Sequence, residues 1–161
     1  MGIVSRNSRT QKTTSLVINF INPRPSLAGG IKSNRLIAEA LVRRGHKVTM
    51  IFVGGRAPPP PWWRVRTSFR YWLNQWKIKD RQKHHLESST ATLLSVPHEK
   101  ILAEHAPDAD VTIATWWETA CWIKDWPPSK GRKAYFIRGH ELYGGDPKLV
   151  AQTYRLPFKK L

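Results

Sequence analysis

Two short groups of residues in this 161-residue sequence could carry chemistry. The first is Gly29-Gly30, which follows an apolar run and opens a helical pattern. Glycines at such a turn let a ligand approach the backbone, and the unpaired N–H groups at a helix start favour phosphate. A plain tight turn is the alternative, because neither the three spaced glycines of a dinucleotide site nor a Walker lysine motif accompanies this pair.

The second group is His140-Glu141, which follows another apolar run and lies in a loop bracketed by glycines. An imidazole titrates near neutral pH and can donate or accept a hydrogen bond, so His140 could hold a polar substrate group or a developing charge. The carboxylates of Glu118 and Glu141 could accept hydrogen bonds from hydroxyl groups. A histidine that satisfies a loop carbonyl, and glutamates that are solvated or ion-paired, are the alternatives.

Other reactive combinations are missing from the sequence. The histidines His84, His85 and His98 lack the spacing of zinc ligands, and Cys121 has no second cysteine beside it. No Gly-x-Ser-x-Gly nucleophile motif occurs. The sequence therefore predicts no metal site and no cofactor. Cys121 lies among tryptophans, so a buried, unreactive thiol is expected there rather than a nucleophile.

The elements that must position these groups alternate between strands and helices. Apolar, β-branched runs predict strands over residues 16–21, 47–53, 91–96, 111–115 and 134–137. Helical spacing and capping residues predict helices over residues 28–44, 98–105, 116–125 and from 146 onward. This order predicts an α/β fold, a Rossmann-like parallel sheet with helices on both faces. Three loops should gather at the carboxyl edge of that sheet: 22–30, 116–119 and 138–145.

Length and composition bound the organisation of the chain. Residues 1–14 are polar and basic and are expected to form a flexible tail, and residues 15–161 suffice for one domain with its own core. No apolar stretch reaches the roughly 20 residues that cross a bilayer, and the N-terminus lacks the apolar segment of a secretory signal. Together with a single cysteine, these features predict a cytoplasmic protein.

The net charge of +16 at pH 7 predicts anionic partners. The most basic stretch is an excursion at residues 56–90, where bulky apolar residues recur every three or four positions among arginines and lysines. Three interpretations compete for this basic aromatic segment. It could pack on the domain, lie peripherally on an anionic membrane surface, or bind nucleic acid. No nucleic-acid motif accompanies it, which disfavours the third interpretation.

Four pieces of the sequence together resemble the N-terminal domain of GT-B fold glycosyltransferases, in particular the large retaining family 4 (group 1) type. The pieces are NPRPSLAGGIKSNRLIAEALVRRGHKVTMI, PDADVTIATWWETACWI, KAYFIRGHELYGGDP and TYRLPFKKL. The resemblance covers residues 15–55 and 91–161. It implies one half of a GT-B fold, namely the Rossmann-like domain on the acceptor side of the cleft.

The resemblance also implies roles for residues at the carboxyl edge. Gly29 and Gly30 match the glycine loop that approaches the donor diphosphate, where Lys32 and Arg35 would add positive charge. Substrates of this type are nucleotide sugars, and the sugar is transferred with retention of configuration and without a metal ion.

The reacting centre and the acceptor would lie on the two other loops of that edge. His140 matches the histidine that contacts the transferred sugar, and Glu141 occupies a position where the family often has an acid. Trp117 and Glu118, on the neighbouring loop, would bind the acceptor, a glycan or a lipid-linked molecule of unknown identity.

The second domain of such enzymes, which grips the nucleotide, has no counterpart in this sequence. The chain is therefore expected to be a fragment, a split gene product or one subunit that pairs with a separate C-terminal half, and to be inactive, or nearly so, alone. The alternative is a non-catalytic module that binds an anionic membrane surface, or nucleic acid, through the basic aromatic segment.

Overall fold

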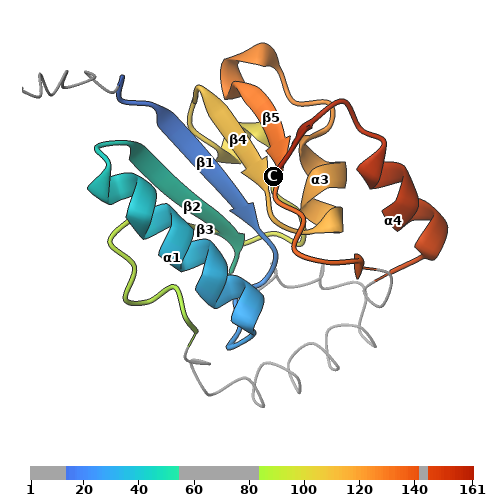
Figure 1. The fold of residues 1–161 in the computed structure, drawn as a ribbon, viewed down its shortest axis with the longest axis horizontal. Helices are drawn as coiled ribbons and strands as arrows, with labels where there is room; N and C mark the ends of the chain where they lie inside the picture. The colour runs from blue at the N-terminus through green and yellow to red at the C-terminus, as the bar shows by residue number, and fades with distance from the viewer. Residues whose placement is uncertain (1–13, 55–83, 142–144) are drawn as a thin grey trace, which may run out of the picture.

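The computed structural model describes residues 14–54, 84–141 and 145–161. A six-stranded sheet in which all neighbours are parallel lies at its centre, with strand order β3-β2-β1-β4-β5-β6 (Figure 1). The strands are β1 (Val17–Asn22), β2 (Lys47–Val53), β3 (Thr92–Val96), β4 (Val111–Ala114), β5 (Arg132–Tyr135) and β6 (Lys159–Lys160). The α-helices are α1 (Gly29–Arg43), α3 (Trp117–Ile123) and α4 (Pro147–Tyr154). The predicted α/β class, a Rossmann-like parallel sheet, is confirmed.

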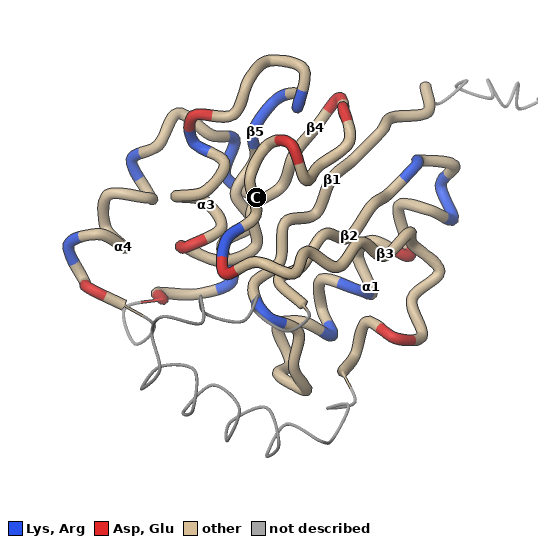
Figure 2. Tube along the Cα trace, turned by 180° about the vertical axis from the view of Figure 1, so that it is seen from behind, with Lys and Arg blue, Asp and Glu red and all other residues tan. Residues whose placement is uncertain are grey.

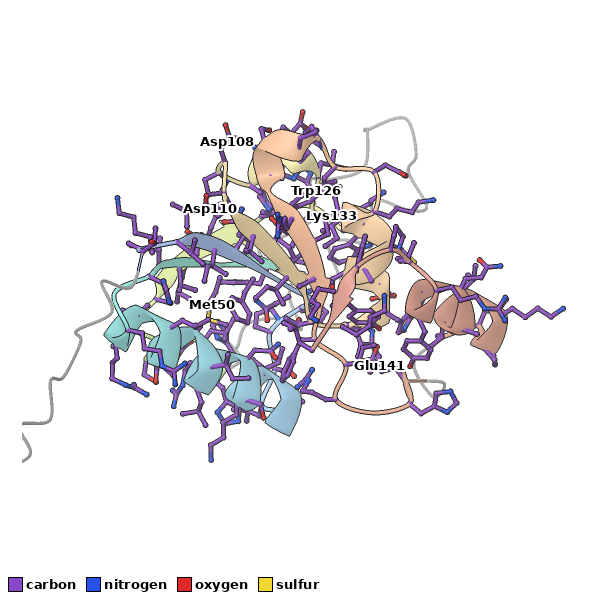
Figure 3. All side chains as sticks on the ribbon, turned by 45° about the horizontal axis from the view of Figure 1, so that its top comes forward. Met50, Asp108, Asp110, Trp126, Lys133 and Glu141 are labelled. Atoms are coloured by element: carbon purple, nitrogen blue, oxygen red, sulfur yellow. The ribbon has the colours of Figure 1, made fainter. Side chains whose placement is uncertain are left out.

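Helices cover both faces of this sheet because side chains alternate along each strand. In β1, Phe20 belongs to the apolar cluster under α1, whereas its neighbour Ile21 belongs to the cluster that includes Ile123 of α3. Figure 3 shows Met50 of β2 between the sheet and α1. The two clusters form one apolar layer on each face of the sheet, as the alternation of strands and helices predicts.

Two predicted helix ends agree with the structure in detail. Gly45 follows α1 with φ at 87°, a conformation that side chains disfavour, and the chain turns there into β2. At the start of α4, the Asp146 side chain accepts a hydrogen bond from Lys148 N at 2.8 Å, and Pro147 occupies the first helical position.

Three features of the second half of the chain differ in detail from the predicted elements or were not predicted. Strand β5 begins at Arg132, two residues before the predicted run, because its charged first residues pair with β4 through backbone groups. The lysines of β6 form an edge strand that hydrophobicity cannot reveal. The one or two helical turns predicted within residues 98–105 are a single 3₁₀ turn, Ala103–His105, and Pro107 follows it.

The predicted tail (1–14) and basic aromatic segment (56–90) lie mostly outside the described residues, which include only Thr14 of the first and residues 84–90 of the second. Within the described part, Lys and Arg are spread over α1, α4 and the loops, interspersed with Asp and Glu (Figure 2). No helix in these three ranges is long and apolar enough to cross a membrane.

Candidate functional site

The segments that follow β1, β4 and β5 meet around an open cavity of about 490 Å³. Its lining includes Gly30 and Ser33 from the first segment, Trp116 from the second, and Arg138, Gly139 and Glu141 from the third. Strands β1 and β4 are neighbours in the sheet but not in the sequence, so the chain leaves them toward opposite faces. Open α/β sheets bind ligands at such a switch point, and this cavity has the size of a small-molecule site.

Gly30 and the Arg138 side chain are in contact, and both line this cavity. A Cβ atom at Gly30 would overlap with the Arg138 guanidinium, whereas a Cβ at Gly29 would have nothing within 4 Å. Arg138 Nη2 also donates a hydrogen bond to the carbonyl oxygen of Thr115 at 3.2 Å, and its guanidinium lies 5.8 Å from the Phe136 ring centroid. The absence of a side chain at Gly30 therefore gives a cation room against the start of α1.

The start of α1 presents backbone donors at the same place. Ala28 precedes the helix in an extended conformation, and no side chain caps it among the described residues. The first N–H groups of a helix have no partner within the helix, and the helix dipole favours negative charge there. Arg24 joins Arg138 in the lining, while Lys32 and Arg35, the cations expected from sequence, are outside the lining.

Glu141 is 2% exposed and connects three elements. Its Oε2 accepts hydrogen bonds from Trp117 N at 2.8 Å and from Tyr135 Oη at 2.7 Å, and its own N–H donates to Tyr154 Oη at 3.0 Å. Figure 3 shows Glu141 between the end of β5 and α4. Burial raises the pKa of this carboxyl, and the hydrogen bonds from Tyr135 and Trp117 and the nearby charge of Arg138 oppose the shift.

His140 lies on the loop that reaches the cavity, but its imidazole packs elsewhere. The side chain is exposed and stacks on Tyr154 of α4, with ring centroids 5.9 Å apart and planes at 30°. Both sequence neighbours of His140 line the cavity, and His140 itself does not. The predicted convergence of the glycine loop and this loop is present, and the imidazole rests beside the cavity on α4.

The residues expected to bind the acceptor lie outside the cavity lining. The Trp117 indole packs against Gly145, where a Cβ atom would overlap with the ring, and Trp116 contributes to the lining in its place. Glu118 is half-buried on α3, and burial raises the pKa of its carboxyl. Two consecutive tryptophans at a strand end point to a rim, but their sequence does not say which one faces it.

Buried amide and hydroxyl groups hold the strand ends that carry the site. Asn34 of α1 donates from Nδ2 to Asn22 Oδ1 at 2.8 Å, and Thr115 Oγ1 donates to the carbonyl oxygen of Ile21 at 2.9 Å. Asn22, Asn34 and Thr115 are each 0% exposed. Since a buried polar group without a partner is costly, these bonds fix α1 and the end of β4 relative to β1. Sequence analysis did not identify Asn22 and Arg138 as site residues, although each directly follows an apolar run, 16–21 and 134–137.

The sequence predicts neither a metal site nor a reactive cysteine. In the described ranges, no group of three or more His, Cys, Asp or Glu residues could hold a metal ion. Cys121 is partly buried, and burial raises the pKa of its thiol, which disfavours the reactive thiolate.

Comparisons with protein-family models, with curated proteins and with solved structures found no match. A functional conclusion therefore depends on the geometry and chemistry of the cavity itself.

Proposed function

We propose that the chain is the acceptor-side domain of a retaining glycosyltransferase, and that the cavity lined by Gly30 and Arg138 receives the diphosphate of a nucleotide sugar. One observation carries this proposal: a guanidinium and an uncapped helix start lie side by side in the lining of one cavity at the switch point of the sheet. Backbone N–H groups and guanidinium groups are both strong donors to phosphate oxygens. The four sequence pieces that resemble GT-B enzymes support the same assignment.

The proposed chemistry needs stabilisation of negative charge. When the bond from the sugar to the donor phosphate breaks, charge develops on the departing diphosphate. Arg138, Arg24 and the first N–H groups of α1 would stabilise this charge in place of a metal ion, because fixed donors need no reorganisation during the reaction. His140 would contact the transferred sugar only after its ring turns from Tyr154 toward the cavity.

The remaining contacts to the donor belong, in the enzymes that the chain resembles, to a second domain without a counterpart in residues 1–161. We therefore expect weak donor binding and no sugar transfer by residues 1–161 alone, because half a cleft cannot hold both reactants in line. A second, nucleotide-binding domain would complete the site. The substrate class suggests a cytoplasmic location, peripheral to the membrane if the acceptor is lipid-linked.

A titration with defined phosphate compounds tests the proposal. The panel comprises UDP-, GDP- and ADP-linked sugars, inorganic pyrophosphate, and the corresponding nucleosides without phosphate. We expect the diphosphate compounds to bind and the nucleosides to give no signal. Arg138→Gln should weaken binding about tenfold, the loss expected for a hydrogen bond to a charged group.

Arg43→Gln is the matched control, because Arg43 is exposed at the opposite end of α1. It lowers the net charge by the same amount as Arg138→Gln without touching the cavity. Equal weakening by both variants would attribute binding to the overall positive field, and equal binding of nucleosides and nucleotide sugars would contradict the assignment of the cavity to a diphosphate.

The membrane-surface alternative depends on the basic aromatic segment, which lies largely outside the described residues. No described contact favours it over the nucleotide-sugar site.

A further inference from the structure

Tyr154 of α4 contacts two consecutive residues of the loop that lines the cavity. Its ring stacks with His140 at 5.9 Å between centroids, and its Oη accepts a hydrogen bond from the backbone N–H of Glu141 at 3.0 Å. The ring also stacks with Tyr135 of β5 at 6.1 Å and 18°. One phenol on α4 thus holds the loop through its ring and through its hydroxyl.

The Glu141 carboxylate ties the same loop from the other side. Oε2 accepts from the Trp117 N–H, which belongs to the first residue of α3, and from the hydroxyl of Tyr135, which is 0% exposed. A rotation of this carboxylate toward a ligand would take its oxygen away from the Trp117 N–H and from the buried Tyr135 hydroxyl, which is unfavourable. The carboxylate is therefore suited to hold α3 and β5 together rather than to exchange protons with a substrate.

Arg138, Gly139 and His140 lie on the loop between the end of β5 and Glu141. Arg138 must stay against Gly30 for the cavity to keep a cation beside the start of α1. Gly139 has no side chain to restrain its backbone, and nothing lies within 4 Å of a Cβ placed there. The position of Arg138 is thus restrained by β5, which precedes it in the sequence, and by the contacts of Glu141, which follows it.

We propose that Glu141 and Tyr154 are positioning residues: the Glu141 carboxylate and the Tyr154 hydroxyl fix the 138–141 loop so that Arg138 stays in contact with Gly30. The inference rests on the proposed function only for the identity of the ligand. The geometry of the loop can be tested without any ligand.

The conservative and disruptive variants of Glu141 separate positioning from acid–base chemistry. Glu141→Gln keeps an oxygen that can accept from Trp117 and Tyr135, whereas Glu141→Ala removes it. We expect Glu141→Ala to weaken pyrophosphate binding about tenfold through loss of the loop position, and Glu141→Gln to restore most of the affinity. If both variants lose binding equally, the charge or the proton of Glu141 is what matters, and the positioning role is wrong.

Tyr154 provides a second test in case Glu141→Ala fails to fold. Tyr154→Phe removes the hydroxyl and keeps the ring, so His140 should retain the ring-current shifts of its imidazole protons while hydrogen exchange at the Glu141 amide accelerates. Tyr154→Leu should lose both signatures. Gln152→Ala, an exposed site on the same helix, is the control and should change neither.

The NMR readouts also separate this inference from the proposed function. If the wild-type chain binds no phosphate compound but the variants change the Glu141 amide and His140 signals as described, positioning stands and the ligand assignment fails. If pyrophosphate binds and Tyr154→Phe leaves both the affinity and the Glu141 amide exchange unchanged, the positioning role is overturned.

Discussion

The backbone of Gly30 lies so close to the Arg138 guanidinium that even a methyl group at this position would displace it. The two residues are far apart in the sequence and come from segments that follow different strands, β1 and β5. Their contact places a cation beside a glycine turn that is unspecific by itself, and both residues line the same cavity. The proposed binding of a diphosphate depends on this contact.

Gly30→Ala should weaken ligand binding without unfolding the protein. The added Cβ meets the far end of a flexible side chain, so Arg138 can move away. Alanine in a helix is favoured over glycine by about 0.5–1 kcal/mol, which offsets part of any strain. We expect pyrophosphate affinity to fall about tenfold with the lost charged hydrogen bond, and the free energy of unfolding to change by less than about 1 kcal/mol.

Gly29→Ala is the control for this prediction, because a Cβ there meets nothing within 4 Å. Calorimetric titration and urea denaturation of both variants give the comparison. If Gly29→Ala weakened binding as much as Gly30→Ala, the contact with Arg138 would not be the cause.

Gly131→Ala should destabilise the fold more than Gly45→Ala does. Both glycines have positive φ, 75° and 87°, a conformation that costs an alanine residue about 1–3 kcal/mol. At Gly131 the new Cβ would also overlap with the backbone of Asp110, which cannot swing away, whereas at Gly45 the space is open. The overlap should add about 1–3 kcal/mol to the loss in free energy of unfolding. Equal losses in urea denaturation would show that Asp110 yields easily.

Glu118 should make the fold less stable as the pH rises. Burial raises the pKa of its carboxyl above the ordinary 4.5, so the folded chain holds this proton more tightly than the unfolded chain. The corresponding stability is fully present below pH 4.5 and is lost as the pH rises through the folded-state pKa.

The glutamine side chain in Glu118→Gln cannot ionise. As the pH rises from 4.5 through the folded-state pKa of Glu118, the free energy of unfolding should therefore fall less for this variant than for the wild type. Denaturation curves across the acid range measure the difference, with Glu99→Gln at an exposed site as the control. A wild type and a Glu118→Gln variant with parallel pH profiles would contradict the cause given for the shift.

The fold could be predicted from sequence wherever local chemistry decides the structure. Gly45 after a helix, Asp146-Pro147 before one, and the β-branched runs of β1 and β2 each act through their own backbone preferences. Strand β6 could not, because Lys159 and Lys160 become a strand only by pairing with β5, a contact that forms in three dimensions.

The site divides in the same way. Its location followed from topology, since loops after parallel strands share one edge. The roles of single side chains did not follow, because the two tryptophans Trp116 and Trp117 are equivalent in sequence and differ only in what they pack against. The sequence likewise places Glu141 as an acid at the edge of the sheet. The hydrogen bonds that it accepts from Tyr135 and Trp117 depend on α3 and β5 coming together in the fold.

The most direct test of the central claim is a titration of the ¹⁵N-labelled chain with UDP-, GDP- and ADP-linked sugars and with pyrophosphate, followed by amide chemical shifts. If the cavity binds the diphosphate, the largest changes fall on the amides of Gly29, Gly30 and Gly139, and they diminish in Arg138→Gln. Changes centred on the opposite edge of the sheet, around Asp110 and Gly131, or no changes at millimolar ligand, would contradict it.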